Sequence, residues 1–162
     1  MNSRQKIVLF LATGGYLGHM PIAPGTFGSL PGLLICLGIS GINLGYAILF
    51  ALVLTGVAIG IAQQAKKLIG GKDPSSIVID EITGMTVTLL GIPLTPFSPM
   101  TPFLLILGFL VFRAFDILKP FPIRLLDQKV PGGAGIVLDD VMAGVYGNVL
   151  IRIVLWVTTT AS

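Results

Sequence analysis

Long runs without charge alternate with short polar stretches along this chain, and the runs predict helices. No Asp, Glu, Lys or Arg occurs in residues 7–65 or in residues 82–112. Residues 44–62 are all apolar or small, and this is about the length that crosses a hydrocarbon layer of roughly 30 Å. Other apolar stretches predict four further helices, over residues 30–42, 80–90, 103–119 and 139–157.

Glycine and proline interrupt the first long run at residues 14–28, GGYLGHMPIAPGTFG, and predict an irregular or re-entrant loop there. Two triplets rich in β-branched residues, at 77–79 and 136–138, are too short for strands and lead into predicted helices. We therefore expect an all-α fold: a polytopic membrane helical bundle with short or broken helices and a re-entrant N-terminal loop. We expect residues 1–162 to form one domain.

The composition indicates that lipid surrounds most of the surface of this protein. Hydrophobic residues make up 54% of the chain, charged residues 10%, and the mean hydropathy is +0.95. So few charges cannot cover a soluble protein of 162 residues, and so much apolar surface excludes a disordered chain. The single Cys36 and the single His19 exclude disulfide frameworks and zinc sites built from several such residues. The basic residues form no dense stripe, which argues against nucleic-acid binding.

The positions of the charges predict an orientation in the membrane. Connections 66–80 and 113–140 are charged, whereas connections 41–45 and 91–102 are not, and all seven carboxylates lie within residues 66–140. By the positive-inside rule, the charged connections and the N-terminus face the cytoplasm. All seven carboxylates then lie on one side of the membrane.

Two similar segments carry adjacent acids: IVIDEITGM at 77–85 and IVLDDVMAG at 136–144. We expect each pair at a helix N-terminus, where free N–H groups and the helix dipole favour acids, and capping alone would explain one such acid. Four acids together would repel one another unless a divalent cation held them. Oxygen-only ligands favour Mg²⁺, Mn²⁺ or Ca²⁺, and Mg²⁺ usually binds phosphate. The four acids are Asp80, Glu81, Asp139 and Asp140.

A third segment, FRAFDILKPFPIR, places Arg113, Asp116 and Lys119 three residues apart on one predicted helix. This spacing is typical of a salt-bridged helix end. It also fits a phosphate clamp in which Arg113, Lys119 and Arg124 hold oxygens while Asp116 orients a base or binds metal.

A fourth segment, APGTFGS at 23–29, combines glycines and hydroxyls before a predicted helix. Backbone N–H groups in such a loop can bind a phosphate, although a tight turn into a membrane helix has the same composition. The candidate substrate-binding residues here are Thr26, Gly28 and Ser29.

These four segments resemble the phosphatidylglycerophosphatase A family. The matching stretches are PIAPGTFGSL at 21–30, DPSSIVIDEITGM at 73–85, FRAFDILKPFPIR at 112–124 and GGAGIVLDDVMAGVYGN at 132–148. The resemblance implies a Mg²⁺-dependent lipid phosphatase of the bacterial inner membrane. Such an enzyme hydrolyses phosphatidylglycerophosphate to phosphatidylglycerol and phosphate, with its active site facing the cytoplasm.

The resemblance and the charges together assign roles to the candidate residues. Metal ligands, or groups that orient them, are expected to be Asp80, Glu81, Asp139 and Asp140. Lys119 and Asp116 complete the expected catalytic set, Asp116 as a ligand or base, while Arg113 and Arg124 bind phosphate. Attack by a metal-activated water is favoured, and an aspartyl-phosphate intermediate remains open.

An alternative from another class is a small membrane transporter or channel subunit that uses intramembrane carboxylates. An ion pathway should distribute charges through the depth of the membrane, whereas these acids gather at one face. Arg152 is the exception. It lies roughly 20 Å along the last helix from Asp139, and we expect it to reach the far interface.

Overall fold

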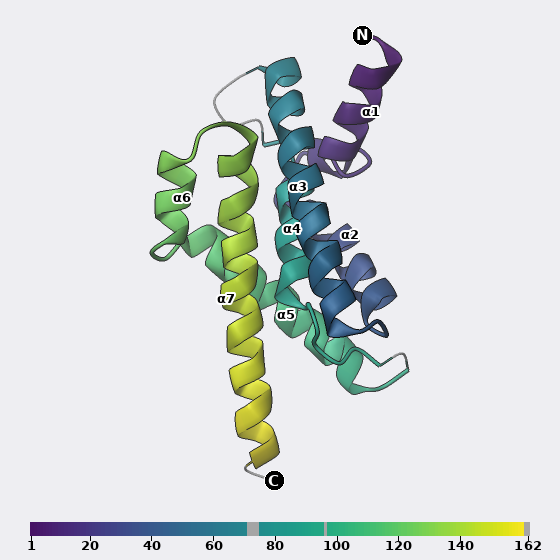
Figure 1. The fold of residues 1–162 in the computed structure, drawn as a ribbon, viewed down its shortest axis with the longest axis vertical. Coiled ribbons are helices and arrows are strands. Elements are labelled where there is room, and N and C mark those ends of the chain that lie inside the picture. Colours follow the sequence, from purple (N-terminus) through teal and green to yellow (C-terminus); the bar gives the residue numbers. More distant parts are fainter. Residues whose placement is uncertain (71–74, 96, 161–162) are drawn as a thin grey trace.

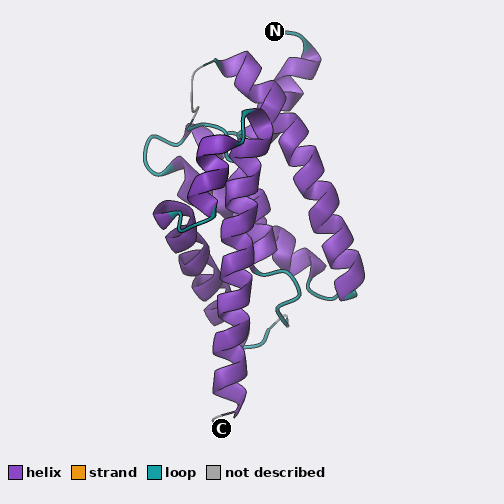
Figure 2. Cartoon of the chain, turned by 60° about the vertical axis from the view of Figure 1, so that its left-hand side comes forward, coloured by secondary structure: helices purple, strands orange, loops and turns teal. Residues whose placement is uncertain are grey.

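The computed structural model describes residues 1–70, 75–95 and 97–160, and these residues form helices and connections without any strand (Figures 1 and 2). The α-helices are α1 (Ser3–Ala12), α2 (Pro24–Ile39), α3 (Leu44–Ile69), α4 (Ile79–Thr88), α5 (Met100–Leu118), α6 (Ile123–Lys129) and α7 (Gly132–Thr160). A single 3₁₀ turn, Leu17–His19, follows α1. By length and composition α3, α5 and α7 can each span a membrane, so the predicted all-α membrane bundle is confirmed.

The candidate spans bury small side chains and expose large apolar ones. In α3 the exposed fractions of Tyr46, Leu52 and Val53 are 71%, 65% and 58%. Its buried face is a row of alanines: Ala47, Ala51, Ala58, Ala62 and Ala65. Small residues between helices and large apolar residues outside are typical of a bundle whose solvent is lipid.

The short helix α4 lies at the centre of the bundle, with α2, α3, α5 and α7 packed around it. Eight of its ten residues are buried, and ten residues are too few to cross a bilayer. Its threonine hydroxyls bond within the helix: Thr83, Thr86 and Thr88 each donate to the carbonyl four residues earlier, at 2.7 to 2.9 Å. These three buried hydroxyl groups therefore need no water.

Two glycines bring α4 and α7 into direct backbone contact. A Cβ atom on Gly84 would collide with the backbone oxygen of Asp140, and one on Gly144 would collide with the backbone oxygen of Gly84. Only hydrogen at these positions allows such a close approach. The contact places the first turn of α4 beside the segment of α7 that carries the second acid pair.

Helices extend into glycine-rich stretches that the sequence pattern assigned to loops. The predicted loop at 14–28 ends early because α2 begins at Pro24, and α7 begins at Gly132 instead of residue 139. The glycines serve as contact points between helices: a Cβ on Gly133 would collide with the backbone of α3, and one on Gly28 would meet the Val78 side chain at 2.5 Å.

Other boundaries also differ from the predictions. α3 continues to Ile69, beyond the predicted end at residue 62, and α6 lies in the charged connection 113–140, at residues where no helix was predicted. Residues 73 and 74 of the DPSS motif lie outside the described residues.

The charged connections gather at one end of the molecule (Figure 1). The C-terminal end of α3, the start of α4, α6 and the start of α7 lie toward that end, as does the N-terminus. The connections after α2 and after α4 lie toward the other end, with the C-terminus. That the charged end faces the cytoplasm remains a prediction.

Candidate active site

The charged ends of α4, α5 and α7 surround one cavity of about 490 Å³. A cavity of this size suits a small polar group such as a lipid headgroup. Its charged lining residues are Lys66, Asp80, Glu81, Arg113, Asp116, Lys119, Asp127, Asp139 and Asp140. The structure thus brings together acids and bases from five separate helices, α3 to α7.

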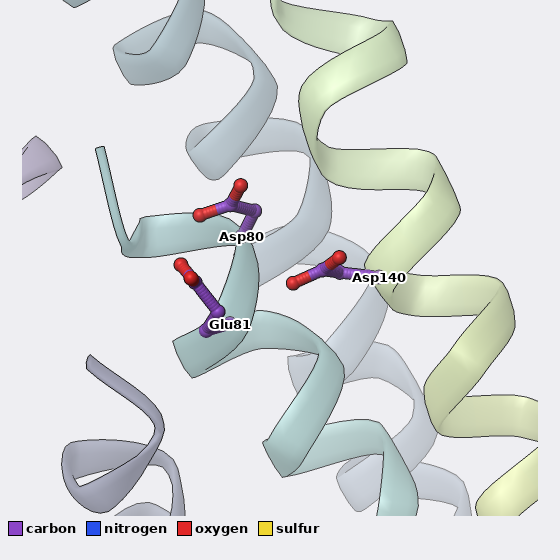
Figure 3. Close-up of side chains that lie close together, drawn as sticks. All are labelled: Asp80, Glu81 and Asp140. Carbon is purple, nitrogen blue, oxygen red and sulfur yellow. The ribbon is translucent and has the colours of Figure 1, made fainter. Parts of the chain in front are cut away.

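Three acids form a tight cluster in this cavity (Figure 3). Asp80 and Glu81 come from the first turn of α4, and Asp140 comes from α7. One carboxylate oxygen of each lies within 4.8 Å of the others. Burial raises the pKa of Asp80 well above its ordinary value, and the charges of Glu81 and Asp140 raise it further. Burial also raises the pKa of Glu81.

Several carboxylate oxygens at this site are buried without a hydrogen-bond partner among the described residues. They are Asp80 Oδ1, Glu81 Oε2, Asp139 Oδ1 and Asp140 Oδ2. Buried acceptors without partners are costly, and three of these four acids, Asp80, Glu81 and Asp140, form one cluster. A divalent cation would satisfy them, and an all-oxygen set fits a hard cation. The residues present therefore fit a metal site.

The N-terminal end of α2 packs closely against this cluster. A Cβ on Gly25 would collide with Glu81 Oε1 and lie 3.2 Å from Arg113 Nη1. Gly25 is therefore required for close packing, and it also lines the cavity. Pro24 and Gly25 of the fourth motif therefore form part of the wall of the site.

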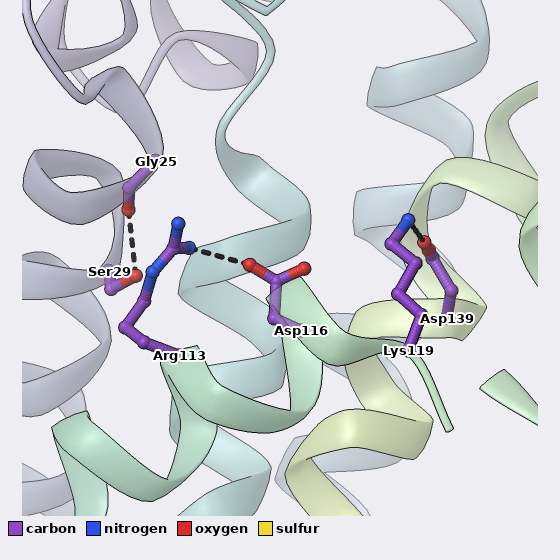
Figure 4. A network of polar contacts seen from close by, with 6 residues as sticks. All are labelled: Gly25, Ser29, Arg113, Asp116, Lys119 and Asp139. Carbon is purple, nitrogen blue, oxygen red and sulfur yellow. Dashed lines mark hydrogen bonds and ion pairs between the residues drawn. The ribbon is translucent and has the colours of Figure 1, made fainter. Parts of the chain in front are cut away.

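The two cations of α5 are each paired with acids in the cavity (Figure 4). Arg113 Nη1 lies 2.7 Å from Asp116 Oδ2. Lys119 Nζ donates to Asp139 Oδ2 at 2.7 Å and lies 3.1 Å from Asp127 Oδ1. Burial lowers the pKa of Lys119, but its bonds to Asp139 and Asp127 outweigh this and raise it overall. Lys119 therefore remains charged.

The predicted position of the second acid pair at a helix N-terminus is wrong. Because α7 already begins at Gly132, Asp139 and Asp140 lie about two turns inside it. Adjacent helical residues point about 100° apart, and the two acids accordingly separate. Asp140 joins the cluster with α4, whereas Asp139 binds Lys119.

Four expected substrate-binding residues are not among the described residues that line this cavity. Gly28 packs against Val78, and Ser29 donates to the carbonyl of Gly25 at 2.8 Å (Figure 4). Arg124 is exposed on α6, and Thr26 is half-buried in the first turn of α2. We leave these four out of the proposed site.

Sequence reasoning did not assign three other polar lining residues to the site: Lys66, Ser75 and Asp127. Lys66 has the sequence signature of a membrane boundary, because it follows a long apolar run. Asp127 is identified only by its contact with Lys119, which depends on how α6 folds back. No motif spacing indicates either contact.

A family model and two relatives indicate the same family. Residues 10–155 match the family model described as phosphatidylglycerophosphatase A. Proteins with that name from Escherichia coli and Haemophilus influenzae are 38% and 35% identical, covering 83% and 87% of this chain and 76% and 84% of theirs.

A protein named putative phosphatidylinositol-3-phosphatase, from Bacteroides thetaiotaomicron, is 35% identical over 92% of this chain and 94% of its own length. No solved structure matches the chain significantly. The matched region contains every acid and base of the cavity described above. The chain belongs to the phosphatidylglycerophosphatase A family.

Proposed function

We propose that this protein is a Mg²⁺-dependent phosphatidylglycerophosphatase of the bacterial inner membrane, acting as one membrane domain at the cytoplasmic face. Its family makes it a phosphoric monoester hydrolase, and relatives named phosphatidylglycerophosphatase A support this substrate. One observation carries the proposal. Four acids with unpartnered buried oxygens lie beside two cations in a single cavity at the charged end of a membrane bundle.

The acid cluster is the proposed cation site. Asp80, Glu81 and Asp140 would hold the ion, and Asp139 would orient groups beside it. When bound, Mg²⁺ neutralises charge on a phosphoryl group and lowers the pKa of a bound water. The oxygen-only ligand set and a phosphate substrate favour Mg²⁺ over softer ions.

Arg113 and Lys119 are the proposed phosphate-binding cations. Each is held at 2.7 Å by a carboxylate, so each is already positioned before substrate arrives. A phosphate monoester dianion accepts charge-assisted bonds from such donors. Substrate oxygens would share or replace the bonds that Asp116 and Asp139 now accept.

Hydrolysis also needs proton transfers that the acids of this cavity can perform. A water oxygen forms a bond to phosphorus, and the bond from phosphorus to the glycerol oxygen breaks. We assign Asp116 the proton of the attacking water, because it lines the cavity beside Arg113. The leaving glycerol oxygen takes up a proton, and we assign its donation to the charged amine of Lys119, which Asp139 holds in the same cavity.

The size of the cavity fits a substrate that stays in the membrane. About 490 Å³ accommodates the phosphorylated glycerol headgroup, while the acyl chains remain in the bilayer. Ile77, Val130 and Ile136 provide apolar positions on the walls. The transporter alternative requires charge through the depth of the bundle, whereas the cavity collects its charges at one end.

Phosphate release by the purified protein in mixed detergent micelles tests the proposed substrate. With Mg²⁺ present, phosphatidylglycerophosphate should be hydrolysed faster than phosphatidylinositol 3-phosphate, the headgroup class in the name of the Bacteroides relative. A preference for the inositol lipid would contradict the proposed substrate. Ion flux in proteoliposomes without phosphate release would favour the transporter alternative.

A further inference from the structure

Asn148 and Arg152 of α7 bind the C-terminal end of α4, opposite the end that carries the acids. Asn148 Nδ2 lies 3.3 Å from the carbonyl oxygen of Val87, 3.0 Å from that of Thr88 and 2.9 Å from that of Leu90. One amide group of α7 therefore serves three carbonyls at the end of α4.

Arg152 fixes the orientation of that amide. Its Nε donates to Asn148 Oδ1 at 2.8 Å, and its Nη2 donates to the carbonyl of Leu90 at 3.0 Å. With Oδ1 held by the guanidinium, the Nδ2 group of Asn148 must face α4. The expectation that Arg152 extends to the far interface assigned it no partner, whereas the structure shows two.

The end of α4 needs such donors. The last carbonyls of any helix lack partners within the helix, and inside a bilayer no water replaces them. α4 is buried and ends after ten residues. A guanidinium within a candidate membrane span is itself costly, so its retention points to the contacts that it makes.

α4 and α7 run in parallel and touch at three levels. At the charged end, Asp80 and Glu81 cluster with Asp140. Further along, Gly84 meets Gly144, and at the far end Asn148 donates to the carbonyls of Val87, Thr88 and Leu90. Asp140 and Asn148 are eight residues apart, about 12 Å along the axis of α7.

We propose that Asn148 and Arg152 are positioning residues, which fix α4 along the axis of α7 and so hold Asp80 and Glu81 in register with Asp140. Neither touches the cavity. Both act through α4, whose first turn carries two of the three clustered acids. The kinetic part of this inference rests on the proposed phosphatase function.

Cys36 offers an independent probe of how α4 is seated. It is the only cysteine in the chain and is 2% exposed. Its Sγ lies 3.7 Å from the carbonyl oxygen of Met85 and 3.6 Å from that of Thr86, both in α4. A shift of α4 along α7 would expose this thiol. Thiol labelling can detect that exposure independently of enzyme activity.

The test compares Asn148→Leu and Arg152→Met with the wild-type protein in detergent. We expect N-ethylmaleimide to label Cys36 at least about tenfold faster in both variants. We also expect kcat to fall about tenfold to a hundredfold at unchanged KM, because displacement of about 1 Å can cost a hundredfold. Arg152→Lys keeps a cationic donor and should restore part of both properties.

Ile153→Met is the matched control, because Ile153 is adjacent and 52% exposed. It should label and turn over like the wild type. Wild-type labelling and kcat in Asn148→Leu and Arg152→Met would overturn the inference, as would global unfolding of both without rescue by Arg152→Lys. Faster labelling together with an inactive wild-type enzyme would support the positioning role and reject the proposed function instead.

Discussion

Lys119 is placed to act both in substrate binding and in the chemical step. It adopts a left-handed backbone conformation at the end of α5, with φ of 42°, and its amine bonds Asp139 and Asp127. These contacts point the cation into the cavity before substrate binds. An amine placed in advance stabilises charge as it develops on the phosphoryl oxygens.

Lys119→Met should therefore lower kcat and kcat/KM together. The loss of transition-state stabilisation should be about 3–4 kcal/mol, as for removal of one preorganised donor. Steady-state kinetics at saturating Mg²⁺ measure both constants, and Lys119→Arg, which keeps the charge, should lose less. If KM alone rises in Lys119→Met, the residue only attracts the headgroup.

The clustered acids should behave as ligands whose charges are unfavourable without a cation. Asp80→Asn and Asp140→Asn each remove one charge from a buried repulsive group, so metal-free variants should unfold at the same or a higher temperature in detergent. Both should lose Mn²⁺ binding, measured by electron paramagnetic resonance.

Asp127→Asn provides the comparison for these two variants, because its side chain is 46% exposed and belongs to no described acid cluster. It should keep Mn²⁺ binding. Tight Mn²⁺ binding by Asp140→Asn would place the cation elsewhere.

At the scale of elements, the site depends on the close approach of α4 and α7. Gly144→Ala adds a methyl group where the carbonyl of Gly84 lies, so the helices must separate. We expect the Mg²⁺ concentration for half-maximal activity to rise at least about tenfold, since ligands on the two helices then move apart.

Gly56→Ala is the matched control on α3. Apart from its own helix turn, no atom lies within 4 Å of the added Cβ, and alanine favours a helix over glycine by roughly 0.5–1 kcal/mol. It should stabilise the protein slightly in thermal unfolding and leave the Mg²⁺ dependence unchanged. Equal effects of the two substitutions on the Mg²⁺ dependence would show that the contact between α4 and α7 does not determine the geometry of the cation site.

Sequence patterns predicted the existence of the long apolar helices better than the residues at which helices begin. Apolar runs mark α3, α5 and α7 because lipid exposure demands uninterrupted hydrophobicity. Glycine is a poor helix former, which led to late predicted starts for α2 and α7. In the fold, Gly133 packs on α3 and its N–H donates to Gln63 Oε1 at 2.5 Å, so a tertiary contact overrides local propensity.

The same reasoning explains which parts of the site were predictable. Acids in an otherwise uncharged chain are conspicuous, and the structure brings all four of the paired acids to one cavity. Their division of contacts was not predictable. It depends on the start of α7, which turns Asp140 toward α4 and Asp139 toward Lys119.

At the scale of the whole molecule, the separation of charged and uncharged connections predicts the topology. Single cysteines at Ser75, Ser98 and Gln128, in a Cys36→Ala background, would be treated with a membrane-impermeant maleimide on intact cells. We expect only Ser98 to be labelled from outside, since it follows α4 at the uncharged end. Labelling at Ser75 or Gln128 would place the cavity on the opposite face.

The central claim is that this cavity hydrolyses phosphatidylglycerophosphate with a cation held by the acids of α4 and α7. The most direct measurement is the initial rate of phosphate release against free Mg²⁺, for the wild type and for Asp140→Asn. The wild-type rate should be negligible in EDTA and saturate as Mg²⁺ rises, while Asp140→Asn should stay at least about a hundredfold slower at every concentration. Full wild-type activity in EDTA, or wild-type rates in Asp140→Asn, would contradict the account.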